Sequence, residues 1–303
     1  MTHEQLQTRL RADAALVEKA LAERTARVDC LRPLTEDDQL TTLKAAQDYS
    51  LMAGGKRIRP ALVLEVCDTL GGERERALPF ACAVEMIHTY SLIHDDLPCM
   101  DNDDMRRGKP TSHKMFGEAT AILAGDGLLT DAFAVAASHA DGNKALLATR
   151  TLAAAAGSVG MVGGQMMDMR GESERLSLDT LLQLHARKTG ALICAAVQLG
   201  AIAAGYKPQD AAWQALTTYA QCIGLAFQVV DDVLDVTADP ALLGKSKGKD
   251  DAENKTTFLT YYTVDEARDY ARRLTEQAVA AVESVDKQGT LVALARYLAE
   301  RVY

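Results

Sequence analysis

Residues 223–236 of the 303-residue chain read IGLAFQVVDDVLDV, and this stretch decides the fold class. Its polar residues are Gln228, Asp231, Asp232 and Asp235, spaced i, i+3, i+4 and i+7. On an α-helix these positions share one face. Because the remaining residues are apolar, the pattern predicts a helix that is buried around most of its circumference and carries one polar stripe.

The carboxylates of this stripe need a positively charged partner. Three carboxylates on one narrow face repel each other, and burial raises their pKa values or destabilises the fold unless cations compensate. Hard cations such as Mg²⁺ accept oxygen ligands and commonly hold phosphates through their remaining coordination positions. An isolated acidic triplet is also compatible with a solvated surface, but the apolar flanks argue against that reading. The stripe therefore indicates a divalent cation site.

A second polar stripe lies about 135 residues earlier, in residues 84–96. His88, Ser91 and Asp95 are spaced i, i+3 and i+7 within an otherwise largely apolar segment. Two acidic clusters, each set in an apolar helix, indicate a metal-dependent site more strongly than either cluster does alone.

The spacing inside the earlier cluster predicts an irregular backbone. Residues 95–104 read DDLPCMDNDD, so Asp95 and Asp101 are six positions apart and would not share a face of an unbroken helix. Pro98 excludes regular helix at this point. We therefore predict a local bulge or turn that returns Asp101 toward Asp95.

The composition favours helices and a single domain over residues 1–303. Alanine and leucine dominate, aromatic residues make up 5% and there are seven prolines, while strand-like alternation is nearly absent. We expect roughly ten helices, separated by short breaks such as Gly54–Pro60, Asp101–Thr111 and Arg170–Ser177. The fold class is therefore all-α.

Charge and hydropathy limit the partners. The net charge of −9 argues against nucleic acid, yet it permits an anionic small molecule if cations bridge it to the protein. The sequence contains no run of about 18 uninterrupted apolar residues, the length that a transmembrane helix would need. The N-terminus lacks the basic start and apolar run of a secretory signal, so we expect a cytoplasmic protein.

Several motifs together resemble the trans-isoprenyl diphosphate synthases, and the bacterial farnesyl diphosphate synthases are the most similar. They occur from about Gly54 to Lys255 and are GGKRIRP at 54–60, EMIHTYSLIHDDLPCMDNDDMRRGKPT at 85–111, LAGD at 123–126, GGQMMD at 163–168, KTG at 188–190 and FQVVDDVLD at 227–235. The resemblance implies a helical bundle around a deep central cavity and, in addition, a homodimer. It also implies an electrophilic 1′–4 coupling of isopentenyl diphosphate to dimethylallyl or geranyl diphosphate, which gives farnesyl diphosphate.

The resemblance also implies residue roles. About three Mg²⁺ ions would be coordinated by the two aspartate motifs, namely Asp95, Asp96, Asp101, Asp231, Asp232 and Asp235. The allylic diphosphate would be reached by three cations, Arg106, Lys188 and Lys245. The diphosphate of isopentenyl diphosphate would be held without metal by Lys56, Arg59, His88 and Arg107. Further substrate contacts would come from Thr189, Gln228 and Lys255.

Two segments are expected to have special shapes. Gly190 weakens regular helix, so a kink at Thr189–Gly190 could direct Lys188 and the Thr189 hydroxyl into the cavity. Residues 237–256 are charged and lack periodicity, as expected of a lid that closes over the diphosphate and keeps water from the carbocation.

Product length should depend on the helix that carries Asp95. Ser91 and Tyr90 precede Asp95 by four and five residues, about 6 and 7.5 Å along the helix axis. A bulky Tyr90 would form the floor of the hydrocarbon channel and stop elongation early. By resemblance, an aromatic residue five positions upstream together with the Pro98–Cys99 region indicates a farnesyl product.

Several other functions fit parts of the sequence. A geranylgeranyl synthase differs only in product length, and a class I terpene cyclase shares the helical bundle and the first aspartate motif. A cyclase would need neither a second aspartate motif nor a basic isopentenyl site. A di-metal carboxylate oxidase needs two Glu-x-x-His motifs, of which only Glu85–His88 is present. A non-catalytic partner subunit would usually have lost one of the aspartate motifs.

Overall fold

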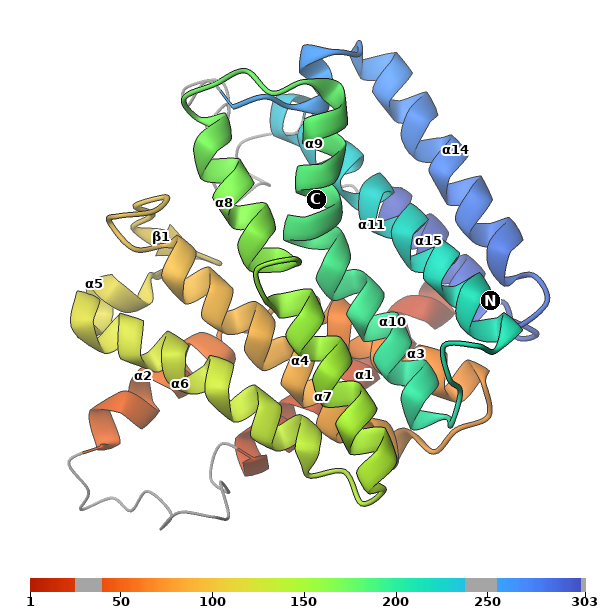
Figure 1. The fold of residues 1–303 in the computed structure, drawn as a ribbon, viewed down its shortest axis with the longest axis horizontal. Helices are drawn as coiled ribbons and strands as arrows, with labels where there is room; N and C mark the ends of the chain where they lie inside the picture. Colours follow the sequence, from red (N-terminus) through yellow and green to blue (C-terminus); the bar gives the residue numbers. More distant parts are fainter. Residues whose placement is uncertain (25–39, 238–254, 301–303) are drawn as a thin grey trace.

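Helices account for nearly all regular structure in the computed structural model, which describes residues 1–24, 40–237 and 255–300 (Figure 1). The strands found in these residues form one short antiparallel hairpin, β1 (Met105–Arg106) and β2 (Lys109–Pro110). The helices are α1 (His3–Arg24), α2 (Thr41–Leu51), α3 (Ile58–Thr69), α4 (Arg74–Asp95), α5 (Ser112–Phe116), α6 (Glu118–Ala137), α7 (Gly142–Ala156), α8 (Met161–Gly171), α9 (Leu178–His185), α10 (Ala191–Ala203), α11 (Ala211–Thr237), α14 (Val264–Val282) and α15 (Thr290–Ala299). A π-helix, η1 (Ala186–Gly190), joins α9 to α10, and η2 (Phe258–Thr260) is a 3₁₀ turn. The all-α expectation is confirmed.

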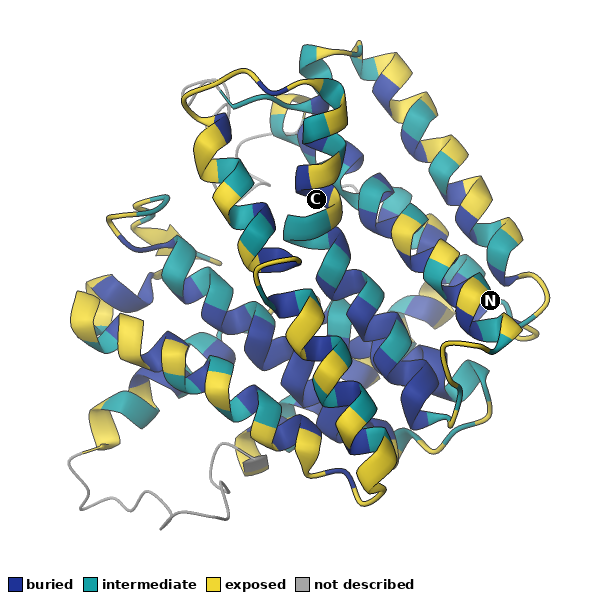
Figure 2. Ribbon diagram, viewed as in Figure 1, coloured by how far each residue is buried: buried dark blue, intermediate teal, exposed yellow. Residues whose placement is uncertain are grey.

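Helix α4 lies in the centre of the bundle and carries the first aspartate motif at its C-terminal end. It packs against α3, α6 and α10, and most of its length is buried (Figure 2). Helix α10 is apolar on nearly every side and is likewise buried, as its sequence predicts. These contacts fix α4 rigidly, so the end that carries Asp95 is held by the core.

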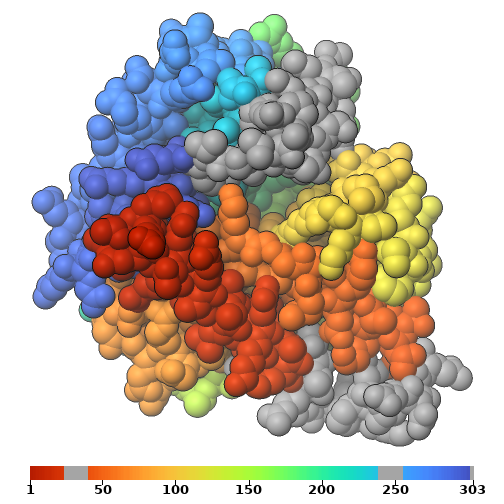
Figure 3. Space-filling model, turned by 180° about the vertical axis from the view of Figure 1, so that it is seen from behind, coloured from red at the N-terminus to blue at the C-terminus, as the bar shows by residue number. Residues whose placement is uncertain are grey.

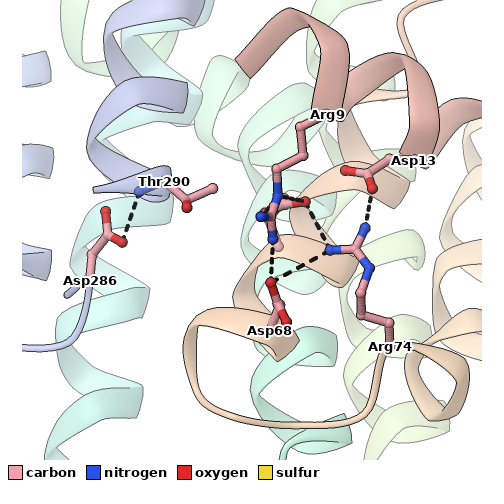
Figure 4. A network of polar contacts seen from close by, with 7 residues as sticks. Arg9, Asp13, Asp68, Arg74, Asp286 and Thr290 are labelled. Carbon is pink, nitrogen blue, oxygen red and sulfur yellow. Dashed lines mark hydrogen bonds and ion pairs between the residues drawn. The ribbon is translucent and has the colours of Figure 1, made fainter. Parts of the chain in front are cut away.

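Helix boundaries follow recognisable caps. The side chain of Asp141 accepts hydrogen bonds from the backbone at the start of α7, and Ser177 does the same for α9. Thr263 and Glu266 form a capping box at the start of α14. Asp286 accepts a hydrogen bond at 2.9 Å from the backbone N–H of Thr290 (Figure 4). It accepts a second one, also at 2.9 Å, from the backbone N–H of Val292 and thereby holds the first turn of α15. The break between α7 and α8 at residues 157–160 is not among those predicted from the sequence.

A buried ion network attaches α1 to the bundle. Arg9 on α1 donates to both oxygens of Glu65 at 2.7 Å and also contacts Asp68 (Figure 4). Arg74, at the start of α4, donates to Glu65 at 3.0 Å and to Asp13 of α1. Seen from behind, α1 lies across the surface beside α15 (Figure 3). The network therefore connects α1 to α3 and to the start of α4, which follow its contacting residues by 56 to 61 positions in the sequence.

Helices α6, α7 and α8 share an exposed apolar face. Its residues include Ile122 and Leu123 on α6, Leu146 on α7 and Val162 and Met166 on α8. The segments Glu118–Ala137 and Gly142–Gly171 are apolar and long enough to cross a membrane, but 39% and 33% of their apolar windows are buried in the bundle. Because helices of soluble bundles meet the same criteria, length and composition alone are weak grounds for a membrane span.

Candidate active site

The turn that follows α4 returns the chain as its spacing predicts. The backbone N–H of Asp101 donates to the carbonyl of Asp95 at 2.8 Å, and that of Asn102 donates to Leu97 at 3.1 Å. These bonds close the helix end in a tight loop, and Asn102 adopts the left-handed conformation (φ 50°). The prediction that a local distortion brings Asp101 back to Asp95 is confirmed.

A cavity of about 390 Å³ opens beside this turn and gathers seven of the predicted site residues. These are Arg59, His88, Tyr90, Ser91, Asp95, Lys188 and Thr189. The opposite wall is made by α8, which contributes Met161, Val162, Gln165, Met166 and Met169. Polar groups therefore lie at the end near Asp95, while flexible apolar side chains form the remaining wall.

Basic groups surround the α3–α4 side of the cavity. Arg59 is largely buried, and its Nε has no hydrogen-bond partner within the described part of the chain. Burial lowers the pKa of Arg59, and the neighbouring charge of Arg107 lowers it further, while Glu85 opposes this. Burial also holds the pKa of His88 well below its usual range, and Arg59 and Arg107 act in the same direction. A cluster of poorly compensated cations is suited to bind an anion.

The two turns that carry Lys56 and Arg107 lie against each other. The Arg107 guanidinium donates to the carbonyl of Gly54, and a Cβ atom on Gly55 would lie 2.9 Å from its central carbon. The absence of a side chain at Gly55 thus makes room for Arg107. Lys56 is exposed beside this contact. Arg57, in contrast, turns into the core and donates to Glu85 at 2.5 Å.

Asp95 is the most strongly perturbed carboxylate of the first motif. Burial raises its pKa to about 6; the positive charge of Lys188 opposes this shift and the negative charge of Asp101 adds to it. The Gln165 amide donates to Asp95 Oδ1 at 2.7 Å and so orients the carboxylate. Functional sites commonly contain carboxylates perturbed in this way.

The second aspartate of each motif is held by protein groups, which differs from the expectation that all six aspartates face metal. Arg106 donates to both oxygens of Asp96 at 2.8 and 2.9 Å, so the pair is closed in this structure. Asp232 is buried and accepts a hydrogen bond at 2.7 Å from the backbone N–H of Phe258 in η2. The physical reason is the same for both aspartates, because burial requires each carboxylate to have a nearby donor.

The rest of the second motif lies on α11. Gln228, Asp231 and Asp235 are partly exposed on this helix, and none of them is among the residues that line the 390 Å³ cavity. The Nζ of Lys255 lies 4.0 Å from Oδ1 of Asp101 and 3.7 Å from Oε1 of Glu172. Lys245 and most of the expected lid, residues 238–254, lie outside the described residues.

The helix distortion near Lys188 is a π-helix, a different form of the kink that the sequence predicts. Residues 186–190 adopt i→i+5 bonding between α9 and α10, and Lys188 and Thr189 line the cavity. Such single-turn π-bulges are frequent at functional sites. The Lys188 ammonium donates to Asp168 on α8.

The site fits Mg²⁺ only if substrate phosphates fill the coordination positions that the protein does not occupy. Across the described ranges, no three carboxylate, histidine or cysteine groups converge into a ready-made metal cage. Mg²⁺ usually binds one or two carboxylates and completes its octahedron with water and substrate phosphates. The turn that joins Asp95 and Asp101 is therefore compatible with an ion that arrives together with a diphosphate.

The contribution of α8 to the site was not predicted from the sequence. Gln165 and Asp168 contact Asp95 and Lys188, and the methionines at 166 and 169 line the cavity. The GGQMMD motif was part of the resemblance, but no role followed from it. The available signal was a pair of polar residues, Gln165 and Asp168, spaced i and i+3 on one helix face. Gln165 directly follows two glycines.

Comparison with known proteins gives a consistent family. Residues 40–294 match the polyprenyl synthetase family. The large subunit 1 of the chloroplastic heterodimeric geranylgeranyl pyrophosphate synthase of Arabidopsis thaliana is 46% identical over 299 residues, covering 95% of this chain and 77% of that protein. The farnesyl diphosphate synthase of Bacillus subtilis is 47% identical over 235 residues, covering 76% and 79%. An apo FPP/GFPP synthase structure from Zymomonas mobilis superimposes with a TM-score of 0.85 at 38% identity, covering 98% and 100%.

Proposed function

Because the chain belongs to the polyprenyl synthetase family, we propose that it condenses isopentenyl diphosphate with dimethylallyl and geranyl diphosphate to give farnesyl diphosphate. The chain is a prenyltransferase of the trans-prenyl diphosphate synthase type. The observation that carries the farnesyl product is the position of Tyr90, which lines the cavity near Asp95 and is only 5% exposed.

The residues around Asp95 are suited to the allylic diphosphate. Asp95, Asp101, Asp231 and Asp235 would hold Mg²⁺, while Asp96 and Asp232 keep Arg106 and η2 in place. When bound, Mg²⁺ supplies Lewis-acid stabilisation of the negative charge that develops as the allylic C–O bond breaks. Lys188 and Arg106 place further positive charge beside the same oxygens, and Lys245 and Lys255 would add to it.

The cluster of Arg59, His88, Arg107 and Lys56 is suited to the diphosphate of isopentenyl diphosphate. The unpartnered Nε of Arg59 supplies a donor that is already desolvated, so an anion gains a strong hydrogen bond without displacing a protein partner. Neutral His88 can donate one further hydrogen bond. With its diphosphate held here, the double bond of isopentenyl diphosphate would face the allylic cation near Asp95. Thr189 and Gln228 would contact substrate oxygens.

The hydrocarbon chain would grow along α4, away from Asp95. Tyr90 packs edge-on against His94, with ring centroids 5.7 Å apart and an interplanar angle of 80°. This contact holds the ring in the cavity wall, while the smaller Ser91 leaves space beside it. Met166 and Met169 line the opposite wall and offer flexible apolar side chains against which the growing chain can pack.

A geranylgeranyl product is the second candidate. The observation that favours it is the 46–47% identity to plant geranylgeranyl pyrophosphate synthases, including that of Capsicum annuum over 84% of this chain. Product analysis separates the two candidates. The purified protein is incubated with isopentenyl diphosphate, Mg²⁺ and each of three starters (dimethylallyl, geranyl and farnesyl diphosphate), and the dephosphorylated products are separated by chromatography. We expect farnesol from the first two starters and no extension of farnesyl diphosphate, whereas geranylgeraniol as main product would contradict the farnesyl assignment.

We further propose a homodimer in which a second copy covers the apolar face of α6, α7 and α8. Leu123 and Leu146 are 59% and 61% exposed, and Val162 and Met166 line the cavity although they are exposed on this side. In a single chain the cavity wall formed by Val162 and Met166 is therefore open to solvent, and a second copy could cover it. Light scattering after size exclusion should give twice the monomer mass for the wild type and the single mass for Leu123→Glu/Leu146→Glu. Met52→Glu, an exposed site outside α6, α7 and α8, should remain dimeric. A monomeric wild type would contradict the proposal.

A further inference from the structure

Helix α8 and the π-helix touch through their backbones. A Cβ atom on Gly164 would lie 2.6 Å from the Cα of Lys188 and still closer to its backbone nitrogen. On another side of the π-helix, a Cβ on Gly224 of α11 would lie 3.2 Å from the Cα of Gly190. Two glycines, one on each neighbouring helix, therefore allow both helices to approach the π-helix this closely.

Asp168 lies one helical turn beyond Gly164 on the same face of α8. Its Oδ2 accepts a hydrogen bond from the Lys188 ammonium, and the two side chains are 17% and 28% exposed. Lys188 also acts on Asp95 electrostatically, because its charge opposes the rise in the Asp95 pKa. The ammonium thus lies within electrostatic reach of Asp95 while it is hydrogen-bonded to Asp168.

We propose that Asp168 is a positioning residue for Lys188: it holds the ammonium beside Asp95 in the free enzyme and releases it to the allylic diphosphate. The inference deepens the proposed function and rests on the assignment of the Asp95 end of the cavity to that diphosphate. Lysine has a flexible four-carbon stem, so an unheld ammonium would lose much rotamer entropy on binding. The hydrogen bond to Asp168 restricts the Lys188 side chain before substrate binds, so part of that entropy is already lost in the free enzyme. The close backbone contact at Gly164 fixes the distance between α8, which carries Asp168, and the π-helix, which carries Lys188.

The sign of the effect separates this role from simple electrostatics. Asp168 is negative, and near a diphosphate a negative charge by itself weakens anion binding. If Asp168 acted only through its own charge, Asp168→Asn would improve binding of the allylic diphosphate. If it acts through Lys188, the same substitution lowers turnover, and the loss depends on the presence of Lys188.

A double-mutant cycle measures this dependence. Asp168→Asn, Lys188→Met and the double variant are compared with the wild type for kcat and KM of geranyl diphosphate, at saturating isopentenyl diphosphate and Mg²⁺. We expect Asp168→Asn to lower kcat/KM by about 10-fold or more in the wild type and by less than about 2-fold in the Lys188→Met background. Asp168→Glu, which retains the carboxylate, should recover part of the loss.

Two further measurements exclude other roles. Thermal unfolding checks that each variant is folded at the assay temperature, and a kcat/KM loss that tracks the melting temperature alone would overturn the proposal. The Mg²⁺ concentration for half-maximal rate is measured in all four proteins. An equal loss in both backgrounds, or a raised Mg²⁺ requirement that persists without Lys188, would also overturn it, because either result makes Asp168 independent of Lys188. An inactive wild type would instead contradict the proposed function itself.

Discussion

Arg106 closes over Asp96, with its Nε 2.8 and 2.9 Å from the two carboxylate oxygens and its Nη2 2.6 Å from Oδ1. Asp95, the neighbouring residue, instead lines the cavity, and its carboxylate accepts a hydrogen bond from the Gln165 amide rather than from an arginine. Two adjacent carboxylates of one motif thus have different surroundings. Their substitutions should separate activity from stability.

Asp95→Asn should abolish Mg²⁺-dependent turnover, by roughly 10³-fold or more, and leave the ligand-free protein more stable. Burial raises the Asp95 pKa to about 6, above its unfolded value near 3.9, so at pH 7.5 the ionised carboxylate opposes folding. Asparagine removes that charge and still accepts from Gln165, which should add roughly 1–2 kcal/mol to the free energy of unfolding. Urea unfolding at pH 7.5 measures this change in the free energy of unfolding. An Asp95→Asn protein that is less stable than the wild type would contradict this description of the site.

Asp96→Asn should instead destabilise the fold. Burial raises the pKa of Asp96 as well, but the hydrogen bonds and charge of Arg106 oppose that rise. The substitution leaves the largely buried Arg106 guanidinium with the more distant Asp103, 3.8 Å away, so we expect a loss of about 3 kcal/mol. The same urea titration provides the measurement, with Asp95→Asn as the matched control one residue away. An unchanged midpoint for Asp96→Asn would show that Arg106 finds an equivalent partner.

Arg57 and Arg59 should also respond in opposite ways. Arg57 is 3% exposed and donates to Glu85 and to the carbonyl of Leu51, so Arg57→Met should lower stability by about 3 kcal/mol. Arg59→Met removes a cation whose pKa burial lowers, so the fold should tolerate it. The KM for isopentenyl diphosphate should rise about 10-fold or more in Arg59→Met. If that KM is unchanged, the basic cluster is not the isopentenyl site.

Tyr90→Ala should lengthen the product beyond fifteen carbons. Removing the ring opens the cavity wall about 7.5 Å from Asp95, where the growing chain would otherwise stop. Tyr90→Phe is the matched control, because it keeps the ring and should keep the wild-type product. Chromatography of dephosphorylated products reports both variants, and an unaltered product from Tyr90→Ala would remove Tyr90 from the floor of the channel.

The ion network below α1 should make stability depend on pH. Burial raises the pKa of Asp13 to about 8, and its neighbour Glu65 adds to the shift. The folded protein therefore binds a proton that the unfolded chain has lost, and this stability is complete below about pH 4 and lost as pH rises through 8. Between pH 6 and 9, the free energy of unfolding of the wild type should fall by roughly 1–3 kcal/mol more than that of Asp13→Asn. Urea unfolding at both pH values measures this difference. Equal losses in the two proteins would contradict a proton that the folded protein retains on Asp13.

The sequence predicts the helical architecture because its patterns are local. The stripe from Gln228 to Asp235 and the apolar residues around it suffice for a buried helix, and Pro98 suffices for the turn that returns Asp101. The residues that line the cavity on α4 also follow from spacing along one helix.

Contacts between distant segments could not be read from local patterns. That Arg57 turns inward and Arg59 toward the cavity depends on Glu85, which lies 28 residues beyond Arg57. Asp232 is directed by a backbone N–H on η2, and Asp168 finds Lys188 because Gly164 allows the backbones of two helices to touch. Each of these choices is decided by the burial of a charge against a partner supplied by another helix.

The most direct test of the central claim is a crystal structure with Mg²⁺ and the unreactive thio analogue of geranyl diphosphate. We predict that the diphosphate lies between Asp95 and Lys188, with Mg²⁺ on Asp95 and Asp101 and the geranyl chain against Tyr90 and Met166. A diphosphate seated elsewhere, or a hydrocarbon chain outside the cavity beside α4, would contradict it.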